Sequence, residues 1–294
     1  MSPLSSVPCV GGAISQTNAL PIVTENLRYW VDADNGDIGH SGTYMYNQVK
    51  GPKAGSSNYR LYCPNAPSYN YRATLDGRTV SYWDFDGTND YGYAENSDEG
   101  TDWDFKNGAT SVNGISGDFT IEYWVRTDIN LYNTLRFPLA RWSYNNNDQR
   151  SFLFGFESNR YQGMVWRNAS GAWSRPYITT TNSLGTFAKD VWHHYVWSFR
   201  KANPDNNNYC YSVVYWNGAL PPGNYTTNPY QGLQNHPLHD GGWKDLYVGT
   251  PYYFDWCWDG QISILRMYNG KALTANEVKR NFNADAAKFG LTPI

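Results

Sequence analysis

The sequence predicts an all-β fold, a sandwich of two antiparallel sheets that is closed by one short helix at its C-terminal end. From residue 81 to residue 268, short runs of alternating apolar and polar residues are separated by turns rich in Asn, Asp and Gly, which is the spacing of an antiparallel sandwich. Aromatic residues make up 17% of the 294 residues, and charged residues also make up only 17%. Such a composition suits strands, because aromatic side chains pack well on a pleated surface.

The first 26 residues differ from the rest of the chain. They are rich in Ser, Pro, Gly and small apolar residues and follow neither the helical nor the strand period, so they predict an extended N-terminal arm. Because terminal segments become ordered only where contacts hold them, we expect the arm to bind a neighbouring subunit. Residues 27–294 are expected to form one domain, although this length also allows two. Its first strand is expected at residues 27–32.

A central strand is expected at residues 118–127. Phe119, Ile121, Tyr123 and Val125 occupy every second position of this segment, so their side chains share one face of the strand. We expect that face to lie in the core between the two sheets.

The last strand is expected at residues 259–270. By the period of two, four alternate residues share one face: Ile262, Ile264, Arg266 and Tyr268. The residues between them point to the other face: Ser263, Leu265 and Met267. Asn269 and Gly270 tolerate positive φ and predict the turn that ends the strand.

Thr274 and Glu277 predict the start of the C-terminal helix. A threonine hydroxyl at the N-cap accepts a backbone N–H of the first turn, and a glutamate three residues later accepts the N–H of the cap. The helix is expected at about residues 275–285. Phe282 and Phe289 are expected to dock this tail on the sandwich.

Charge and hydropathy argue against two classes of partner. The formal net charge of −3 lacks the basic footprint of a nucleic-acid-binding protein, and no apolar run is long enough to cross a bilayer. We therefore expect neither nucleic acid nor a membrane as a partner. The first residues have neither the charged nor the apolar segment of a secretory signal. Without such a signal, the four cysteines are expected to be reduced: Cys9, Cys63, Cys210 and Cys257.

Four segments together resemble the laminin-G-like branch of the concanavalin A-like lectin/glucanase fold. In order, they are residues 85–91, residues 118–126, residues 192–196 with 214–218, and residues 246–249 with the closing strand and helix. The resemblance covers roughly residues 80–285 and implies a concanavalin A-like jelly-roll β-sandwich. It implies little about activity, because this sandwich carries many unrelated functions.

Hydrolysis is the first activity to consider, because this fold includes glucanases. A retaining glycosidase needs two carboxylates about 5–5.5 Å apart, and the hydrolase branch of the family supplies them as Glu-x-Asp-x-(x)-Glu on one strand. The sequence has no such run, and Glu122 stands alone on its strand. We therefore expect no enzyme activity and no catalytic residues; a glycoside hydrolase of the same fold is the least favoured alternative.

Histidines and acidic loops are the candidates for metal or catalytic sites. His193 and His194 are adjacent on a strand, so they point to opposite faces, and the resemblance implies a structural role for both. Residues 236–240 combine two histidines and an aspartate in a loop, which is not a closed tetrahedral metal site. Residues 32–37 carry suitable oxygens for calcium but lack the EF-hand pattern. We expect no cofactor, with calcium left open.

Sugar binding is the main functional candidate from the residues themselves. Exposed aromatic rings stack on sugars, and Asn, Asp and Gly loops supply hydrogen bonds. Five aromatic residues lie in clusters or near polar loops and are the candidate binding residues: Tyr144, Trp173, Tyr252, Tyr253 and Trp256. The sequence alone does not separate this role from packing in the core or from a protein interface.

The resemblance narrows further at residues 27–33, 41–43, 85–91 and 281–291, which look like laminin-G-like proteins encoded by tailed bacteriophages. This resemblance implies a virion structural protein at the virion surface, such as a capsid decoration protein, assembled in the host cytoplasm. Its expected partners are other virion proteins, bound through the N-terminal arm, and further copies of itself. The alternative is a carbohydrate-binding module of a tail or fibre adhesin that recognises a host glycan.

Overall fold

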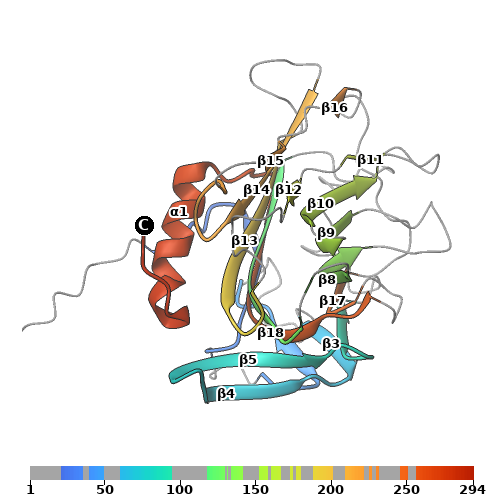
Figure 1. Cartoon of the computed structure of the whole chain (residues 1–294), viewed down its shortest axis with the longest axis vertical. Coiled ribbons are helices and arrows are strands. Elements are labelled where there is room, and N and C mark those ends of the chain that lie inside the picture. Colours follow the sequence, from blue (N-terminus) through green and yellow to red (C-terminus); the bar gives the residue numbers. More distant parts are fainter. Residues whose placement is uncertain are drawn as a thin grey trace, which may run out of the picture.

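The computed structural model describes residues 21–35, 40–49, 60–94, 118–129, 131, 134–141, 152–157, 160–166, 173–174, 177–179, 188–200, 209–221, 225–226, 230–231, 246–250 and 256–294. Within these residues the chain forms two antiparallel sheets and one α-helix (Figure 1). The predicted all-β sandwich with a short C-terminal helix is confirmed. No helix in the described part of the chain is long and apolar enough to span a membrane.

The first sheet has eight strands among the described residues. Across the sheet they are β16 (Tyr230–Gln231), β14 (Tyr209–Trp216), β13 (Trp192–Arg200), β7 (Phe119–Thr127), β18 (Asp259–Asn269), β5 (Arg78–Asp86) and β4 (Ser68–Leu75), and β1 (Leu27–Asp32) also pairs with β18. The N-terminal half of β18 pairs with β5 and its C-terminal half with β1. The last strand of the chain, β18, therefore lies within this sheet and pairs with the first strand, β1.

The second sheet has ten strands in the part of the chain that the structure describes. In order they are β15 (Tyr225–Thr226), β12 (Tyr177–Thr179), β10 (Arg160–Trp166), β9 (Phe152–Glu157), β8 (Leu135–Arg141), β17 (Leu246–Val248), β6 (Tyr91–Ala94), β3 (Arg60–Asn65) and β2 (Tyr44–Tyr46), and β11 (Trp173–Ser174) pairs with β10. The edge strand β2 is only three residues long, and short edge strands limit unwanted pairing with other chains.

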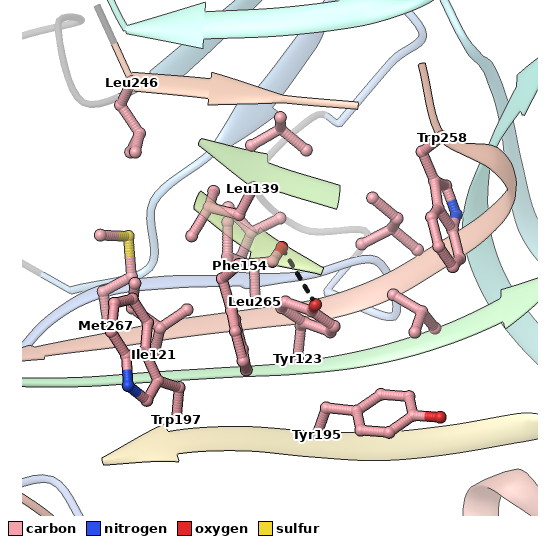
Figure 2. Packing of buried hydrophobic residues seen from close by; sticks show 14 of the residues in the cluster. Ile121, Tyr123, Leu139, Phe154, Tyr195, Trp197, Leu246, Trp258, Leu265 and Met267 are labelled. Atoms are coloured by element: carbon pink, nitrogen blue, oxygen red, sulfur yellow. Dashed lines mark hydrogen bonds between the residues drawn. The ribbon is translucent and has the colours of Figure 1, made fainter. Parts of the chain in front are cut away.

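The main core lies between the two sheets, and β7 is at its centre. Phe119, Ile121, Tyr123 and Val125 all belong to this core, so the predicted inward face of β7 is confirmed. Figure 2 shows Tyr123 beside Phe154 of the second sheet, where its hydroxyl donates to the Phe154 carbonyl over 3.3 Å. This hydrogen bond satisfies the polar end of a fully buried tyrosine.

The predicted faces of β18 are partly wrong. Ile262 lies in the inter-sheet core together with Leu265 and Met267, whereas Ile264 packs on the other side of the sheet. The cause is a β-bulge between Ile262 and Ile264, where the register with β7 shifts by one residue. An extra residue reverses the alternation beyond the bulge, and no period-of-two pattern reveals it.

The C-terminal helix α1 (Ala275–Asp285) covers the outer face of the first sheet (Figure 1). Thr274 is its N-cap and forms the predicted capping box with Glu277. The 3-10 helix Ala286–Phe289 follows it directly. Phe282 and Phe289 stack on Trp124, with ring centroids 5.6 and 4.2 Å apart. The predicted docking of this tail on the sandwich is therefore confirmed.

Both described ends of the chain are held on α1. The Val23 N–H donates to the side-chain oxygen of Asn281 over 2.8 Å, and the Tyr268 hydroxyl donates to the Val23 carbonyl over 3.0 Å. At the other end, Asn283 exchanges two hydrogen bonds with the backbone of Ile294. Residues 21–26 of the predicted arm thus pack on their own domain. Residues 1–20 lie outside the described residues, so the arm as a binding element stays a prediction.

Candidate functional site

Four tyrosines form a row across the second sheet. Tyr44 on β2 is the register partner of Tyr62 on β3, Tyr62 is the partner of Tyr93 on β6, and Tyr93 is the partner of Tyr247 on β17. The row therefore runs perpendicular to the strands, and we call these four residues the tyrosine row. Successive ring centroids along it are 5.8, 5.8 and 6.1 Å apart.

The alternation of the four short strands places the tyrosine row on the outer face of the sheet. The chain neighbours of the row residues are buried in the inter-sheet core, namely Met45, Leu61, Cys63, Leu246 and Val248. Since successive side chains of a strand point to opposite faces, the tyrosines point away from that core. Tyr62 is 37% exposed and Tyr247 only 6%, so access to solvent is greatest in the middle of the row.

Two further tyrosines flank the row on the same face. Tyr46 lies 6.0 Å from Tyr44, and Tyr91 lies 6.0 Å from Tyr93 in a stacked arrangement. Burial, and then the neighbouring Tyr62, raise the pKa of Tyr91, and a tyrosine phenol is protonated at neutral pH already at its ordinary pKa. A protonated phenol both donates and accepts hydrogen bonds, which gives this aromatic surface a polar function as well.

The two ends of the tyrosine row differ in character. At the β2 end, the guanidinium of Arg60 lies 3.9 Å from the centroid of the Tyr44 ring. At the β17 end, Tyr247 is in register with Ala140, and Ala140 with Leu153. Ala140 and Leu153 are buried in a small cluster with Phe137. The row is thus open and cationic at one end and closed by apolar packing at the other.

The five residues that the sequence predicts to bind sugar lie in different parts of the chain. Trp256 is half-buried and packs on the cluster at the closed end, 5.8 Å from Phe137 between ring centroids. Trp173 lies in β11, where its backbone pairs with that of Trp166. Tyr144, Tyr252 and Tyr253 lie outside the described residues. Binding of sugar by all five stays a prediction, and none of them belongs to the tyrosine row.

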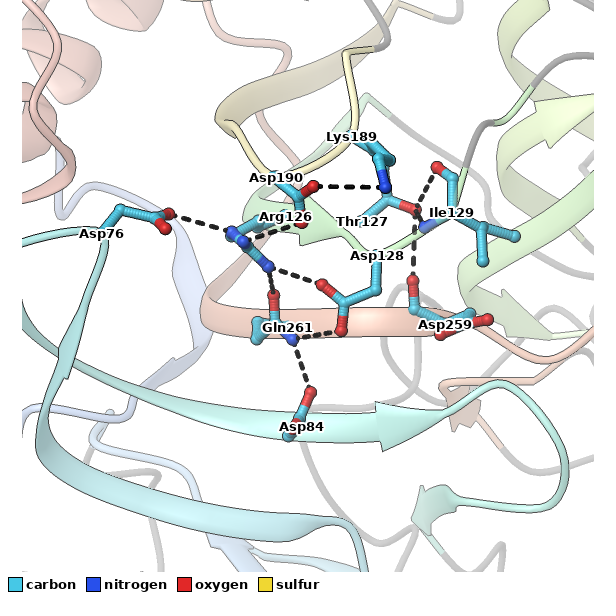
Figure 3. A network of polar contacts seen from close by, with 10 residues as sticks. All are labelled: Asp76, Asp84, Arg126, Thr127, Asp128, Ile129, Lys189, Asp190, Asp259 and Gln261. Carbon is cyan, nitrogen blue, oxygen red and sulfur yellow. Dashed lines mark hydrogen bonds and ion pairs between the residues drawn. The ribbon is translucent and has the colours of Figure 1, made fainter.

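A network of polar contacts lies at the end of the first sheet where β5, β7 and β18 meet (Figure 3). Its centre is Arg126, whose nitrogens lie 3.3 Å from Asp76, 2.5 Å from Asp128 and 2.8 Å from Asp190. Arg126 also donates to the side-chain oxygen of Gln261 over 2.7 Å. One buried arginine therefore holds three carboxylates that come from three separate turns.

Gln261 extends this network to a fourth carboxylate. Its amide nitrogen donates to Asp84 over 2.6 Å and to Asp128 over 2.7 Å. Burial raises the pKa of Asp84, and the nearby Asp128 raises it further. Figure 3 shows the amide of Gln261 lying between these two carboxylates.

A second polar network is buried beneath α1. Glu122 on β7 is fully buried and lies 2.5 Å from Arg266 and 3.2 Å from the His194 ring. Arg266 also pairs with Asp285 at the end of α1, over 2.7 Å. Burial opposes the ionisation of Glu122, yet Arg266, His194 and a hydrogen bond from Asn281 together lower its pKa to about 2.

The family model described as the concanavalin A-like lectin/glucanases superfamily, in its Laminin_G_3 form, matches residues 86–279. The match spans most of the chain, from the end of β5 to the first turns of α1. The chain belongs to this superfamily. The resemblance that the sequence segments carry is thereby confirmed at the level of the fold family. A comparison with curated proteins finds no match.

Solved structures with a similar fold include several toxin binding domains. The chain is similar to the binding domain of Paraclostridial Mosquitocidal Protein 1 (13% identity, TM-score 0.53, covering 90% of this chain and 55% of that one). It is also similar to the botulinum neurotoxin serotype G binding domain, with 12% identity and a TM-score of 0.54 over 89% of this chain and 52% of that one. The receptor binding domain of botulinum neurotoxin D has 10% identity and a TM-score of 0.54 over 89% of this chain and 53% of that one. The chain spans about half the length of these structures, and the likeness shows a shared fold.

Because the superfamily includes glucanases, the carboxylates of the Arg126 network are candidates for the carboxylate pair of a glycosidase. Asp84 and Asp128 both accept a hydrogen bond from the Gln261 amide, and the pKa of Asp84 is raised, which is a property of general acids. The Gln261 amide, however, occupies the space between them, and Arg126 engages Asp128. A glycosidase needs that space for the scissile bond and water. The arrangement therefore favours a structural role for the network.

The other residues considered for catalysis or metal binding also have structural partners. His193 accepts a hydrogen bond from the Trp216 indole over 3.1 Å, and burial lowers its pKa to about 4. His194 packs on the opposite face beside Glu122. Both placements agree with the structural role implied by the resemblance. Residues 236–240 lie outside the described residues.

The calcium alternative at residues 32–37 finds little support in residues 32–35, and residues 36–37 lie outside the described residues. Asp32 accepts the N–H of Asp34 over 3.0 Å, and the Lys288 ammonium lies between the two carboxylates, 3.1 Å from Asp32 and 2.5 Å from Asp34. A lysine thus supplies the positive charge that a cation would bring. Among the described residues no group of three or more His, Cys, Asp or Glu side chains could hold a metal ion.

Proposed function

We propose that this chain is a non-catalytic carbohydrate-binding domain that binds its ligand on the tyrosine row. The observation that carries the proposal is the register of Tyr44, Tyr62, Tyr93 and Tyr247 on four neighbouring strands of an outward face. Sugar rings have an apolar face that stacks on aromatic rings and a rim of hydroxyls that needs hydrogen bonds. A row of phenols offers both kinds of contact on a rigid sheet.

The energetics of the sheet also favour a binding role for these residues. A cross-strand pair of aromatic residues contributes about 0.2–1 kcal/mol to the stability of a sheet, and pairs of polar or β-branched residues contribute a similar amount. Stability of the sheet alone therefore does not require tyrosines at these positions. A half-exposed aromatic surface is costly to leave in water, and contiguous patches of this kind mark binding sites. The superfamily of lectins and the binding domains among its structural relatives agree with this proposal.

Binding to a panel of neutral and acidic polysaccharides, measured by affinity electrophoresis and calorimetry, tests the proposal. Replacing the most exposed ring of the row, in Tyr62→Ala, should weaken binding about tenfold or more, which is about 1.4 kcal/mol. The matched control is Tyr71→Ala, because Tyr71 is 46% exposed on β4 of the other sheet. Equal losses in the two variants, or no binding by the wild-type chain, would contradict the proposal.

The virion location is a finer proposal that rests on the resemblance of sequence segments to tailed-bacteriophage proteins. It is compatible with the first proposal if the domain is a surface adhesin. Deleting residues 1–24, most of the arm predicted at residues 1–26, would remove Val23, whose side chain is buried against α1. Deleting residues 1–20 leaves that contact in place, and should abolish incorporation into the particle while the domain keeps its fold. Unchanged incorporation of this variant would contradict anchoring by the arm.

A further inference from the structure

The tyrosine row is longer than one sugar ring. Neighbouring strands lie about 4.8 Å apart, so its four strands extend over ~14 Å from the first to the last. Tyr44, Tyr62 and Tyr93 are spaced at 5.8 Å between ring centroids. A single terminal sugar would cover one of these rings and leave the others in water, whereas a chain of sugars covers them in sequence.

The open end of the row presents a positive charge. Arg60 lies on β3 beside Tyr62 and over the ring of Tyr44. Two other arginines of the chain, Arg126 and Arg266, each pair with at least two carboxylates. Within the described residues, no carboxylate forms an ion pair with Arg60. The cation–π contact uses the face of the guanidinium and leaves its in-plane N–H donors for an acceptor.

Within the described residues, the carboxylates nearest in sequence to the row belong to the β5–β6 turn. Asp86 accepts the backbone N–H groups of Thr88 and Asn89 over 2.8 and 3.0 Å, and Asp90 accepts that of Asp86 over 3.0 Å. Burial opposes the ionisation of Asp86, but these hydrogen bonds lower its pKa. Among the described residues, negative charge therefore lies on the Tyr91 side of the surface and positive charge at Arg60. Complementarity places an acidic group of the ligand at Arg60.

We infer that the tyrosine row binds a linear polysaccharide that contains uronic acid units. Its sugar rings lie on Tyr93, Tyr62 and Tyr44, across the strands, and a uronate carboxylate pairs with Arg60. The inference rests on the proposed function and adds the length and the charge of the ligand. A bidentate pair between a guanidinium and a carboxylate fixes the orientation of the chain on the sheet.

Calorimetry with galacturonate, mannuronate and hyaluronate oligosaccharides, from the monosaccharide to the hexasaccharide, tests the inferred length and the inferred charge of the ligand. Affinity should rise with each added unit up to three or four units and then level off. The methyl esters of the galacturonate series keep the sugar rings but lose the charge, and should bind about tenfold more weakly. Salt at about 150 mM limits the repulsion from the net charge of −3 to about 8 Å.

Arg60→Gln should bind acid and ester equally well, and Arg60→Lys, which keeps the charge without the planar fork, should retain part of the preference. The matched control is Arg72→Gln, because Arg72 lies over the exposed Tyr71 at 5.2 Å in the other sheet. Circular dichroism and the thermal midpoint of each variant report whether the fold is kept.

The outcomes separate the inference from the proposed function. Equal binding of acid and ester, or of monosaccharide and hexasaccharide, would overturn the inference while Tyr62-dependent binding keeps the proposed function. Binding of neutral polysaccharides alone would also overturn the inference and keep the proposed function. Absence of binding to every carbohydrate would overturn both.

Discussion

The outer faces of the two sheets use their residues in opposite ways. The outer face of the first sheet lies under α1 and contains fully buried charges, with Glu122 and Arg266 at 0% exposure. The outer face of the second sheet carries the tyrosine row, where Tyr62 is 37% exposed. Charged groups are thus buried on one face, and aromatic groups are left partly in solvent on the other.

This difference indicates which face is built for stability and which for contact. Buried charges are tolerated only when they are paired and hydrogen-bonded, and the Glu122 network meets this condition through residues of β7, β13, β18 and α1. An aromatic row that contacts water adds little to folding, so its register and length are better explained by a ligand. The following predictions test this division, from the largest expected effect to the smallest.

The largest effect is expected on the covered face. Arg266→Met removes the partner of Glu122 and leaves a buried carboxylate without its counter-charge, which should cost about 3–5 kcal/mol of unfolding free energy. Urea unfolding measures it. Adding Glu122→Gln to this variant should recover part of the loss, because the fully buried one of the two carboxylates that Arg266 had paired is then neutral. A loss below about 1 kcal/mol in the single variant would show that the network does not stabilise this face.

The core between the two faces should respond nearly as strongly. Ile121 is fully buried on the inward side of β7, so Ile121→Ala should cost about 2–5 kcal/mol through lost burial and a cavity. Leu220→Ala is the control, since Leu220 is 39% exposed. Equal and small losses in the two variants would contradict the inward assignment of β7.

A pH effect is expected where the two sheets are tied together at His40. The Tyr46 N–H donates to Nδ1 of His40, so Nε2 carries the proton and donates to the Asp32 carbonyl over 3.0 Å. Burial lowers the pKa of His40 to about 4, against a smaller opposing effect of Asp32. The unfolded chain therefore binds a proton between pH 6.5 and about 4 that the folded chain does not.

The contribution of His40 should thus be complete above pH 6.5 and be lost as the pH falls to about 4, on the order of 2 kcal/mol. Urea midpoints across this range measure the loss. His40→Gln should flatten the profile but not remove it, because His193 titrates in the same range. An unchanged profile in His40→Gln would contradict the assigned role.

The smallest effect on stability is expected on the open face. Tyr62→Ala removes one cross-strand aromatic contact on each side and should cost less than about 1 kcal/mol, although it should abolish most carbohydrate binding. Thermal unfolding and calorimetry on the same sample give both quantities. A loss of several kcal/mol without any change in binding would assign the tyrosine row to stability and end the contrast between the faces.

The elements that the sequence predicted correctly depend on short-range patterns. Alternation over residues 118–127 was sufficient to assign the inward face of β7, and the spacing of Thr274 and Glu277 was sufficient to place the start of α1. The face of Ile262 was wrong because one extra residue in β18 reverses the alternation. A bulge is set by pairing with a neighbouring strand, and this information is absent from the strand itself.

The candidate site was missed for a similar reason. The tyrosine row takes one residue from each of four strands, from Tyr44 to Tyr247 in the sequence, and only their register brings the rings together. The repeated Tyr-x-Tyr pattern at residues 44–46 and 91–93 was the available local signal. Aromatic residues that cluster locally in the sequence lie instead near loops, and a cluster in sequence does not show that its rings share a surface.

The attachment of both described chain ends to α1 has a consequence for how the domain can be displayed. Val23 and Ile294 are held on the helix side of the first sheet, whereas the tyrosine row faces outward from the second sheet. Anything joined at residue 21 or residue 294 therefore starts from the side away from the tyrosines. Several copies linked through these ends can engage one polymer together, and avidity can then exceed the affinity of one copy by a factor of about 10²–10⁴.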